Sequence, residues 1–214
     1  MPGNSLRGLT AHVIGGNRLI EHLLKTESCR LRGIETADII VFTGGTDINP
    51  QIYKQNAHSR TQFPDLIRDR MEQAVYQNLS KNQWKVGICR GAQLLHALNG
   101  GVLWQHVEGH GHPHEMRYVR KDGTEKVFMV SSTHHQMMNL RASNGVIWGW
   151  SNQTRRREFP DGKAFEMSSE HWKDPEIIYY KDSLSLCFQP HPEYSVPKDT
   201  KTVFLDCLNR AVEL

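Results

Sequence analysis

The segment Val86-Gly87-Ile88-Cys89-Arg90-Gly91-Ala92-Gln93 decides the fold class, because an apolar run turns there into a helical pattern. Lys85–Ile88 is predicted to be a buried strand, and the leucines after Gln93 recur at helical spacing. A nucleophile on such a tight turn needs small neighbours, which Gly87 and Gly91 provide. The start of a helix favours a thiolate at Cys89 and directs the free N–H of Arg90 at a developing oxyanion. A lone cysteine would more simply be a buried structural residue, but this context predicts a nucleophile in an α/β fold.

The rest of the chain predicts a mixed sheet covered by helices. Ala11–Ile14 and Ala37–Phe42 are apolar runs typical of strands, and Lys198–Val212 is predicted to be an amphipathic helix. From Met116 to Phe188, short β-like runs follow one another, with a hairpin signal at Asp122-Gly123. The predicted helix 65–80 carries an apolar stripe formed by Leu66, Met71, Ala74, Val75 and Leu79. Alternating strands and helices followed by successive strands indicate an α/β protein with a mixed sheet.

Length and composition exclude several classes of protein. The 214 residues predict a single domain spanning residues 1–214, and a hydrophobic share of 38% suits an ordinary globular core. A net charge of +3 is too small to indicate nucleic-acid binding, and the basic run Arg155-Arg156-Arg157 is expected in a solvated turn. No apolar run approaches the roughly 18 residues needed to span a membrane, and residues 1–8 lack the apolar core of a signal peptide. The four cysteines form no C-x-x-C pair, so we expect a cytoplasmic enzyme without disulfides.

Two further loops follow predicted buried strands, although each alone would be an ordinary connection. Phe188-Gln189-Pro190-His191-Pro192-Glu193 is an extended segment, in which residues i and i+2 point to the same side. Glu193 can therefore orient the His191 ring, and His191 can serve as the base that a nucleophilic thiol needs. Thr43-Gly44-Gly45-Thr46 lets the backbone approach a ligand, and the N–H of Gly45 is a candidate second oxyanion donor. All three loops are expected at the carboxyl ends of strands, where open α/β sheets bind ligands.

Several other motifs accompany these three loops between residues 38 and 194. They are Gly44-Gly45-Thr46-Asp47-Ile48-Asn49-Pro50 with Tyr53, Arg68-Asp69 with Glu72, Gly100-Gly101, and Ser132-Thr133-His134-His135-Gln136. On these motifs the chain resembles the class I glutamine amidotransferase-like superfamily. Within it, the Gly-Gly-x-Asp and His-His-Gln segments make the chain most similar to the γ-glutamyl hydrolases of the peptidase C26 group, especially the γ-glutamyl-γ-aminobutyrate hydrolase type.

The resemblance implies a catalytic triad of Cys89, His191 and Glu193, with an oxyanion hole formed by the backbone N–H groups of Gly45 and Arg90. It further implies a substrate site that comprises Gly44, Gln93, His134, His135 and Gln136. The implied fold is a doubly wound, flavodoxin-like sheet with helices on both faces, and no cofactor is implied. The segment after the first strand holds only about one helix, so the peripheral unit near the N-terminus is expected to be trimmed.

The expected chemistry is hydrolysis of a γ-glutamyl amide through a thioester, which releases glutamate and an amine or ammonia. The substrate would then be a small γ-glutamyl compound or glutamine. A first alternative is a glutaminase subunit that supplies ammonia to a separate synthetase partner. A second alternative, of another class, is a catalytically idle binding or regulatory module on the same fold. The sequence leaves the substrate, the need for a synthetase and the oligomeric state open.

The chain contains 12 histidines, and four of them gather in one segment: His106, His110, His112 and His114. Imidazoles at such density can form a zinc site, to which nearby glutamates could contribute. Gly109, Gly111 and Pro113 instead favour an irregular, flexible polar loop near the entrance of the site. Because the resemblance implies no metal either, we expect none, and the mechanism leaves the histidine cluster unexplained.

Overall fold

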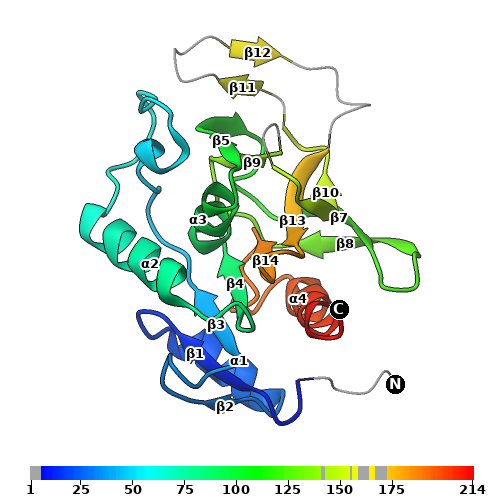
Figure 1. Ribbon diagram of the computed structural model, residues 1–214. Helices are drawn as coiled ribbons and strands as arrows, with labels where there is room; N and C mark the ends of the chain where they lie inside the picture. The colour runs from blue at the N-terminus through cyan, green and yellow to red at the C-terminus, as the bar shows by residue number, and fades with distance from the viewer. Residues whose placement is uncertain (1–5, 141–142, 155, 159–163, 167–172) are drawn as a thin grey trace.

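A nine-stranded sheet forms the centre of the computed structural model, which describes residues 6–140, 143–154, 156–158, 164–166 and 173–214 (Figure 1). Within these residues the strand order is β2-β1-β3-β4-β14-β13-β10-β7-β8. The strands from β2 to β14 pair in parallel, and those from β14 to β8 pair antiparallel. The mixed sheet predicted from the sequence is therefore confirmed.

The parallel half of the sheet contains β1 (Thr10–Val13), β2 (Arg30–Leu31), β3 (Ile39–Phe42), β4 (Trp84–Ile88) and β14 (Ser185–Phe188). The antiparallel half contains β7 (His114–Val119), β8 (Glu125–Val130), β10 (Val146–Ser151) and β13 (Asp174–Tyr180). Short strands outside this sheet are β5 (Val102–Trp104), β6 (His106–Glu108), β9 (Met137–Asn139), β11 (Arg156–Glu158) and β12 (Ala164–Glu166). The helices are α1 (Arg18–Thr26), the 3₁₀ helix η1 (Pro50–Tyr53), α2 (Leu66–Asn78), α3 (Arg90–Leu98) and α4 (Lys198–Val212).

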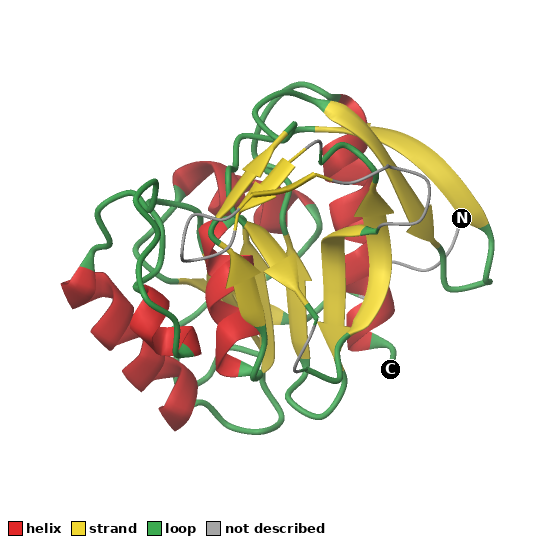
Figure 2. Ribbon diagram, turned by 90° about the horizontal axis from the view of Figure 1, so that it is seen from above, coloured by secondary structure: helices red, strands yellow, loops and turns green. Residues whose placement is uncertain are grey.

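Helices cover both faces of the sheet, and each face has its own apolar core (Figure 2). On one face, α1 and α4 pack side chains such as Leu24 and Phe204 against the strands. On the other face, α3 contributes Leu94 and Leu95. Figure 1 shows α3 and α4 on opposite sides of β4 and β14. The strands between these helices are buried on both faces, which is why β3 reads as an uninterrupted apolar run.

The N-terminal edge of the sheet is short, as expected for a trimmed peripheral unit. β2 is a two-residue strand that pairs in parallel with β1, and no helix separates β2 from β3 in the described residues. The predicted hairpin at Asp122-Gly123 is also confirmed, since it joins the antiparallel strands β7 and β8. The sequence did not indicate β2, β5, β6, β9 or β11, because two or three residues carry too little pattern.

The predicted apolar stripe of α2 is correct only for Val75 and Leu79, which pack against the core, and wrong nearer the start of the helix. Leu66 and Met71 are exposed, with 48% and 64% of their surface accessible. The buried residues of this helix are Asp69 and Glu72, both at 2%. The reason is electrostatic: the inner face of α2 meets a buried guanidinium group, which needs carboxylate partners more than apolar contact.

The basic run was also placed incorrectly, although Arg155 lies outside the described residues. Arg157 is 2% exposed and forms an ion pair with Asp174, which is equally buried. Its strand β11 pairs with β6, so the guanidinium group enters the interior instead of a solvated turn. Burial of a charge is tolerated here because the opposite charge is buried with it.

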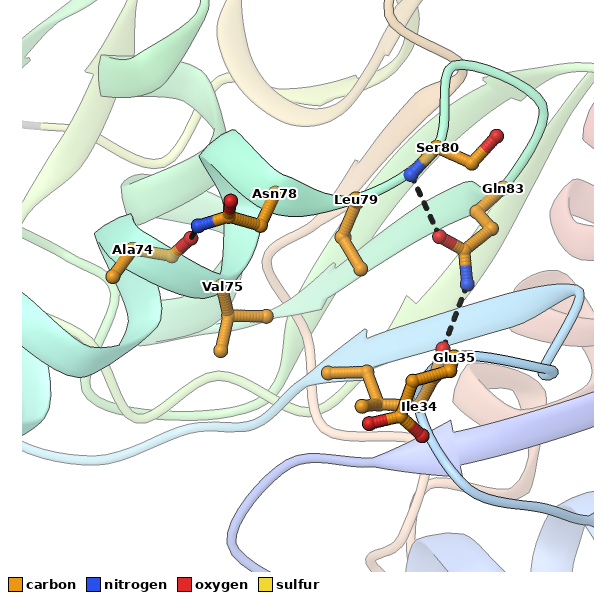
Figure 3. Close-up of a pocket in the computed structure, with 8 residues that line it drawn as sticks. All are labelled: Ile34, Glu35, Ala74, Val75, Asn78, Leu79, Ser80 and Gln83. Atoms are coloured by element: carbon orange, nitrogen blue, oxygen red, sulfur yellow. Dashed lines mark hydrogen bonds between the residues drawn. The ribbon is translucent and has the colours of Figure 1, made fainter.

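A cavity of about 490 Å³ lies between the C-terminal half of α2 and the connection from β2 to β3 (Figure 3). Val75 and Leu79 form part of its apolar wall, and Gln83 donates a hydrogen bond to the carbonyl oxygen of Ile34. None of the predicted site residues lines this cavity. Across the described residues, no helix is long and apolar enough to cross a membrane.

Candidate active site

Three neighbouring parallel strands bring the predicted catalytic loops to one edge of the sheet. The strands β3, β4 and β14 lie side by side with β4 in the middle. The chain leaves them at Thr43, Cys89 and Gln189, all at their carboxyl ends. Side chains from three distant parts of the sequence therefore meet at the position where open α/β sheets bind ligands.

Cys89 sits on a strained turn between β4 and α3. Its φ of 51° and ψ of −110° are unfavourable for a residue with a side chain. The flanking glycines make the turn achievable, because a Cβ atom at Gly87 would overlap the backbone of Gly91 and Ala92, and one at Gly91 would overlap the carbonyl group of Phe42. Cys89 is 7% exposed and directly precedes the first turn of α3, whose N–H groups favour negative charge.

His191 links Cys89 to a carboxylate. Its Nδ1 atom lies 2.8 Å from Oε1 of Glu193, and its ring forms a hydrogen bond with Cys89. Burial alone would lower the pKa of His191, but the bonds to Cys89 and Glu193 outweigh burial and raise that pKa to about 10. The Tyr194 ring stacks on the imidazole with a centroid separation of 4.5 Å. The histidine is therefore oriented and held in its protonated form at neutral pH.

Ser131 fixes the backbone of His191, a contact that the sequence did not indicate. The Ser131 hydroxyl accepts a hydrogen bond from the His191 N–H at 2.8 Å and donates one to the His191 carbonyl oxygen at 3.1 Å. Thr200, at the start of α4, accepts a hydrogen bond from the Ser131 N–H at 2.9 Å. The imidazole is thus positioned from both its ring and its main chain.

The Gly44-Gly45 loop lies against the cysteine and the histidine. A Cβ atom at Gly44 would come within 2.9 Å of Cε1 of His191 and 3.6 Å of Cβ of Cys89. A Cβ atom at Gly45 would overlap the guanidinium group of Arg68. Only glycine leaves space at these positions, so the backbone forms the wall of the site here.

A network of charged side chains from α2 supports this loop and the turn at Cys89. The Arg90 side chain is 2% exposed and forms ion pairs with Asp69 and Glu72. Arg68 joins Glu72 at 2.8 Å and donates hydrogen bonds of 2.9 Å to the carbonyl oxygens of Thr43 and Gly44. Side chains of α2 therefore hold both the Gly44-Gly45 loop and the turn at Cys89. Asp69 and Glu72 are three residues apart, so they share one face of the helix. This spacing was the only sequence feature that hinted at a charged network on that face.

The predicted substrate-binding residues divide into two groups. His135 and Gln136 contact Asp47 of the Gly44–Pro50 loop, at 3.2 Å and 3.0 Å, and Gln93 lies on α3 within 3.4 Å of the Gln136 carbonyl oxygen. His134 has a different partner: its Nε2 atom lies 3.6 Å from Glu176 of β13. The site therefore brings Gln93, His135 and Gln136 together, while His134 faces the interior behind them.

The expectation of a flexible polar loop at the histidine segment is wrong. His110 is completely buried and His114 is 5% exposed, and both lie 3.1 Å from Oε1 of Glu176. His106, in β6, is also buried, and only His112 is exposed among the four. The cause is the buried carboxylate of Glu176, which draws imidazoles to it because an isolated charge cannot remain in the interior.

The family model of peptidase C26 matches residues 12–153 of this chain. The chain belongs to the peptidase C26 family. The matched residues include Cys89, whereas His191 and Glu193 lie beyond them. The membership predicted from the motifs is confirmed.

Relatives and solved structures agree with this assignment. The glutamine amidotransferase-like protein YvdE of Lactococcus lactis subsp. lactis is 28% identical over 84% of this chain and 75% of its own length. The protein NtpR of Enterococcus hirae is 30% identical over 75% and 68%, respectively. A candidate GMP synthase subunit from Thermoplasma acidophilum superimposes with a TM-score of 0.62 at 15% identity, covering 96% of this chain and 94% of that one. A glutamine amidotransferase from Thermotoga maritima gives 0.57 at 13% identity, with coverages of 96% and 99%.

These similarities establish a class I glutamine amidotransferase fold. The family match and the relatives make the chain a glutamine amidotransferase-like hydrolase.

Proposed function

We propose that this C26 family member hydrolyses the amide bond of a γ-glutamyl compound through a thioester on Cys89. The observation that carries the proposal is the Cys89–His191–Glu193 arrangement on adjacent strand ends, with Oε1 of Glu193 2.8 Å from Nδ1 of His191. A nucleophile, a base and an orienting carboxylate in this order are the requirements of acyl transfer.

The reaction follows from these positions. The Cys89 thiolate attacks the δ-carbonyl carbon, and the backbone N–H groups of Gly45 and Arg90 stabilise the oxyanion. The C–N bond breaks as protonated His191 gives its proton to the leaving amine, which leaves a γ-glutamyl thioester. A water molecule, deprotonated by His191, then attacks the thioester, and glutamate and the free thiolate result.

The walls of the site suit the glutamyl part of the substrate. Gly44 and Gly45 supply backbone groups, and Gln93, His135 and Gln136 supply polar side chains that contact one another or Asp47 of the same loop. His134 supports the proposal less directly, because its imidazole faces Glu176. We therefore assign substrate contact to Gly44, Gln93, His135 and Gln136.

A panel of γ-glutamyl amides, with glutamine among them, tests the function by release of glutamate. The expected result is turnover of at least one γ-glutamyl amine without any added protein, with a γ-glutamyl adduct on Cys89 that mass spectrometry detects after acid quenching. Release of ammonia from glutamine only after addition of a synthetase would instead assign the glutaminase alternative. No turnover together with a Cys89 thiol that resists alkylation would assign the idle binding module.

The pH profile of the reaction is a further prediction. As the pH rises through about 10, His191 loses the proton that the leaving amine needs, so kcat/KM is expected to fall there. Glu193→Gln removes a charge that raises this pKa, so the fall begins at lower pH and the maximal rate drops by at least about 100-fold. Kinetics over the pH range, with the His191 pKa measured by NMR, check both effects. Glu35→Gln, an exposed carboxylate, is the matched control and should leave the profile unchanged. An unshifted profile in Glu193→Gln would contradict the role of Glu193.

A further inference from the structure

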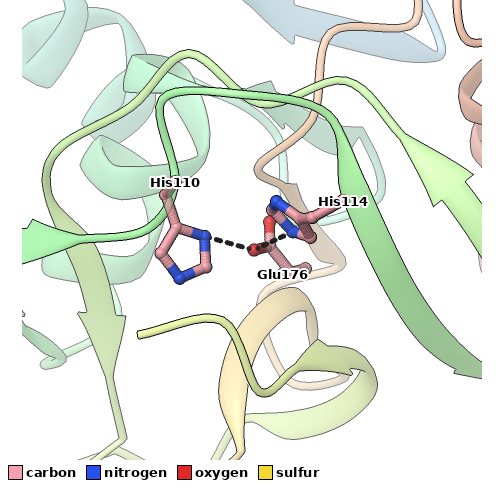
Figure 4. A group of neighbouring side chains, drawn as sticks. All are labelled: His110, His114 and Glu176. Carbon is pink, nitrogen blue, oxygen red and sulfur yellow. Dashed lines mark hydrogen bonds and ion pairs between the residues drawn. The ribbon is translucent and has the colours of Figure 1, made fainter. Parts of the chain in front are cut away.

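Three histidines surround one glutamate in the interior behind the proposed substrate site. His110 lies in the connection between β6 and β7, His114 is the first residue of β7, and His134 lies between β8 and β9. Glu176 projects from β13 between them, and Figure 4 shows His110 and His114 directed at its carboxylate. All four side chains are almost completely buried. Segments distant in sequence therefore converge on one buried carboxylate that the proposed reaction does not use.

The separations between these groups match those of metal ligands. The Nδ1 atom of His110 and the Nε2 atom of His114 each lie 3.1 Å from Oε1 of Glu176, and Nε2 of His134 lies 3.6 Å from Oε2. In a tetrahedral zinc site with bonds of about 2.0–2.1 Å, neighbouring ligand atoms are about 3.3–3.4 Å apart. The separations of His110 and His114 from Glu176 are close to this value, and the ligand atoms of these three residues all lie within 4.8 Å of one another. His134 lies further out, so it joins the same ion only after a shift of its side chain.

Each ring also uses its outer nitrogen in the way that metal-binding histidines do. Nε2 of His110 lies 3.0 Å from the hydroxyl of Thr154. Nδ1 of His114 lies 3.3 Å from the His112 carbonyl oxygen, and Nδ1 of His134 lies 2.9 Å from the Gln136 carbonyl oxygen. A carbonyl oxygen only accepts, so the outer nitrogen of His134 carries the proton, and in a neutral ring its inner nitrogen presents a lone pair to the interior. His114 can donate from either nitrogen, because its Nε2 atom faces the Glu176 carboxylate at 3.1 Å.

Hydrogen bonds within the cluster satisfy only some of the inner atoms, among them Nε2 of His114 and Oε1 of Glu176. Among the described residues, Nδ1 of His110, Nε2 of His134 and Oε2 of Glu176 have no aligned hydrogen-bond partner. Lone pairs that face a carboxylate repel it, and protonation of all three rings would bury three positive charges beside Glu176. Asp174 balances only part of this charge, because one of its oxygens lies 3.4 Å from Nε2 of His110 and the other already pairs with Arg157. A cation shared by the four groups resolves both difficulties.

We propose that His110, His114, His134 and Glu176 bind a divalent metal ion. Imidazole and carboxylate ligands in this number favour Zn²⁺. Four protein ligands leave no open position, so the ion has a structural role and does not activate water. It joins the β6–β7 connection and the segment of His134 to β13. His135 and Gln136 directly follow His134 and contact Asp47, so the ion also fixes one wall of the proposed substrate site.

Metal analysis of the wild-type protein tests the site without any variant. The protein is purified without a histidine tag, stripped with a chelator, and dialysed against Zn²⁺. The expected result is one zinc ion per chain by elemental mass spectrometry, and Co²⁺ in its place should show the visible absorption of a tetrahedral ion. Both results should persist in Cys89→Ala, which excludes the active-site thiol as the ligand. A wild-type protein that retains no ion after dialysis overturns the proposal.

Ligand variants locate the ion. His114→Ala and Glu176→Gln are expected to bind Zn²⁺ at least about 10-fold more weakly. His112→Ala is the matched control, because it removes an exposed imidazole from the same segment and should bind as the wild type does. Zn²⁺ should raise the Tm of the wild type and of His112→Ala but not that of Glu176→Gln. Equal affinities in His114→Ala and His112→Ala overturn the proposal. If the ligand variants do not fold, X-ray absorption of the wild-type zinc protein decides, since the proposal requires nitrogen and oxygen ligands and no sulfur.

Discussion

Replacement of Cys89 by alanine is expected to lower kcat/KM for γ-glutamyl amides by at least about 10⁴-fold. Without the thiolate no thioester forms, and the N–H groups of Gly45 and Arg90 can only polarise the carbonyl group toward direct attack by water. Polarisation and substrate binding alone leave a small fraction of the catalysed rate. Glutamate release under saturating and limiting substrate measures the loss, and the KM of the residual activity separates binding from chemistry.

Cys29→Ala is the matched control for this prediction. Cys29 is 3% exposed, and burial together with Glu27 and Asp38 raises the pKa of its thiol to about 11. It is therefore an uncharged core group, and its removal should leave kcat/KM close to the wild-type value. Hydrolysis that survives in Cys89→Ala but fails in Cys29→Ala would place the nucleophile elsewhere and contradict the proposed mechanism.

The loops at the strand ends could be predicted from the sequence because their signals are local. Each signal depends only on residues that are close together in the sequence. These signals are the glycines around Cys89, the alternation in His191-Pro192-Glu193, and the glycine pair at 44 and 45. The order of β3, β4 and β14 then brings them together, because parallel neighbours end at the same edge of a sheet. Local backbone geometry, together with the rule that neighbouring parallel strands end at the same edge, was sufficient to predict that these three loops meet.

The inner face of α2 and the histidine cluster could not be predicted for the opposite reason. Asp69 and Glu72 are buried because Arg90, on another helix, meets them in the interior. His114 is buried because Glu176, 62 residues further along the chain, lies beside it. Periodicity measures hydrophobicity along one element, so it assigns a charged residue to the surface even when its partner is buried elsewhere. The same assumption wrongly predicted that apolar residues of this helix such as Met71, which is exposed, would lie in the core.

Arg90→Met is expected to lower the free energy of unfolding by about 3–5 kcal/mol, because it leaves Asp69 buried without an opposite charge and Glu72 with only the partly exposed Arg68. The methionine fills most of the space of the arginine stem, so the loss reports on charge more than on volume. The backbone N–H of residue 90 remains, so the proposed oxyanion donor is kept. Urea denaturation followed by circular dichroism measures the effect. Hydrolysis should also fall, since α2 positions the carbonyl groups of Thr43 and Gly44 through Glu72 and Arg68.

Two further variants separate the buried charge from other causes. Arg68→Met removes a guanidinium group that is 28% exposed, and Glu72 would keep its partner Arg90, so its loss of stability should be clearly smaller. Adding Asp69→Asn and Glu72→Gln to Arg90→Met removes both buried carboxylate charges and should restore a large part of the stability. If Arg90→Met is as stable as Arg68→Met, or if neutralising both carboxylates restores nothing, the ion pairs do not hold α2 against the turn at Cys89. If Arg90→Met does not fold at all, recovery of a cooperative transition in the triple variant makes the same distinction, because only the charge of the two carboxylates differs between them.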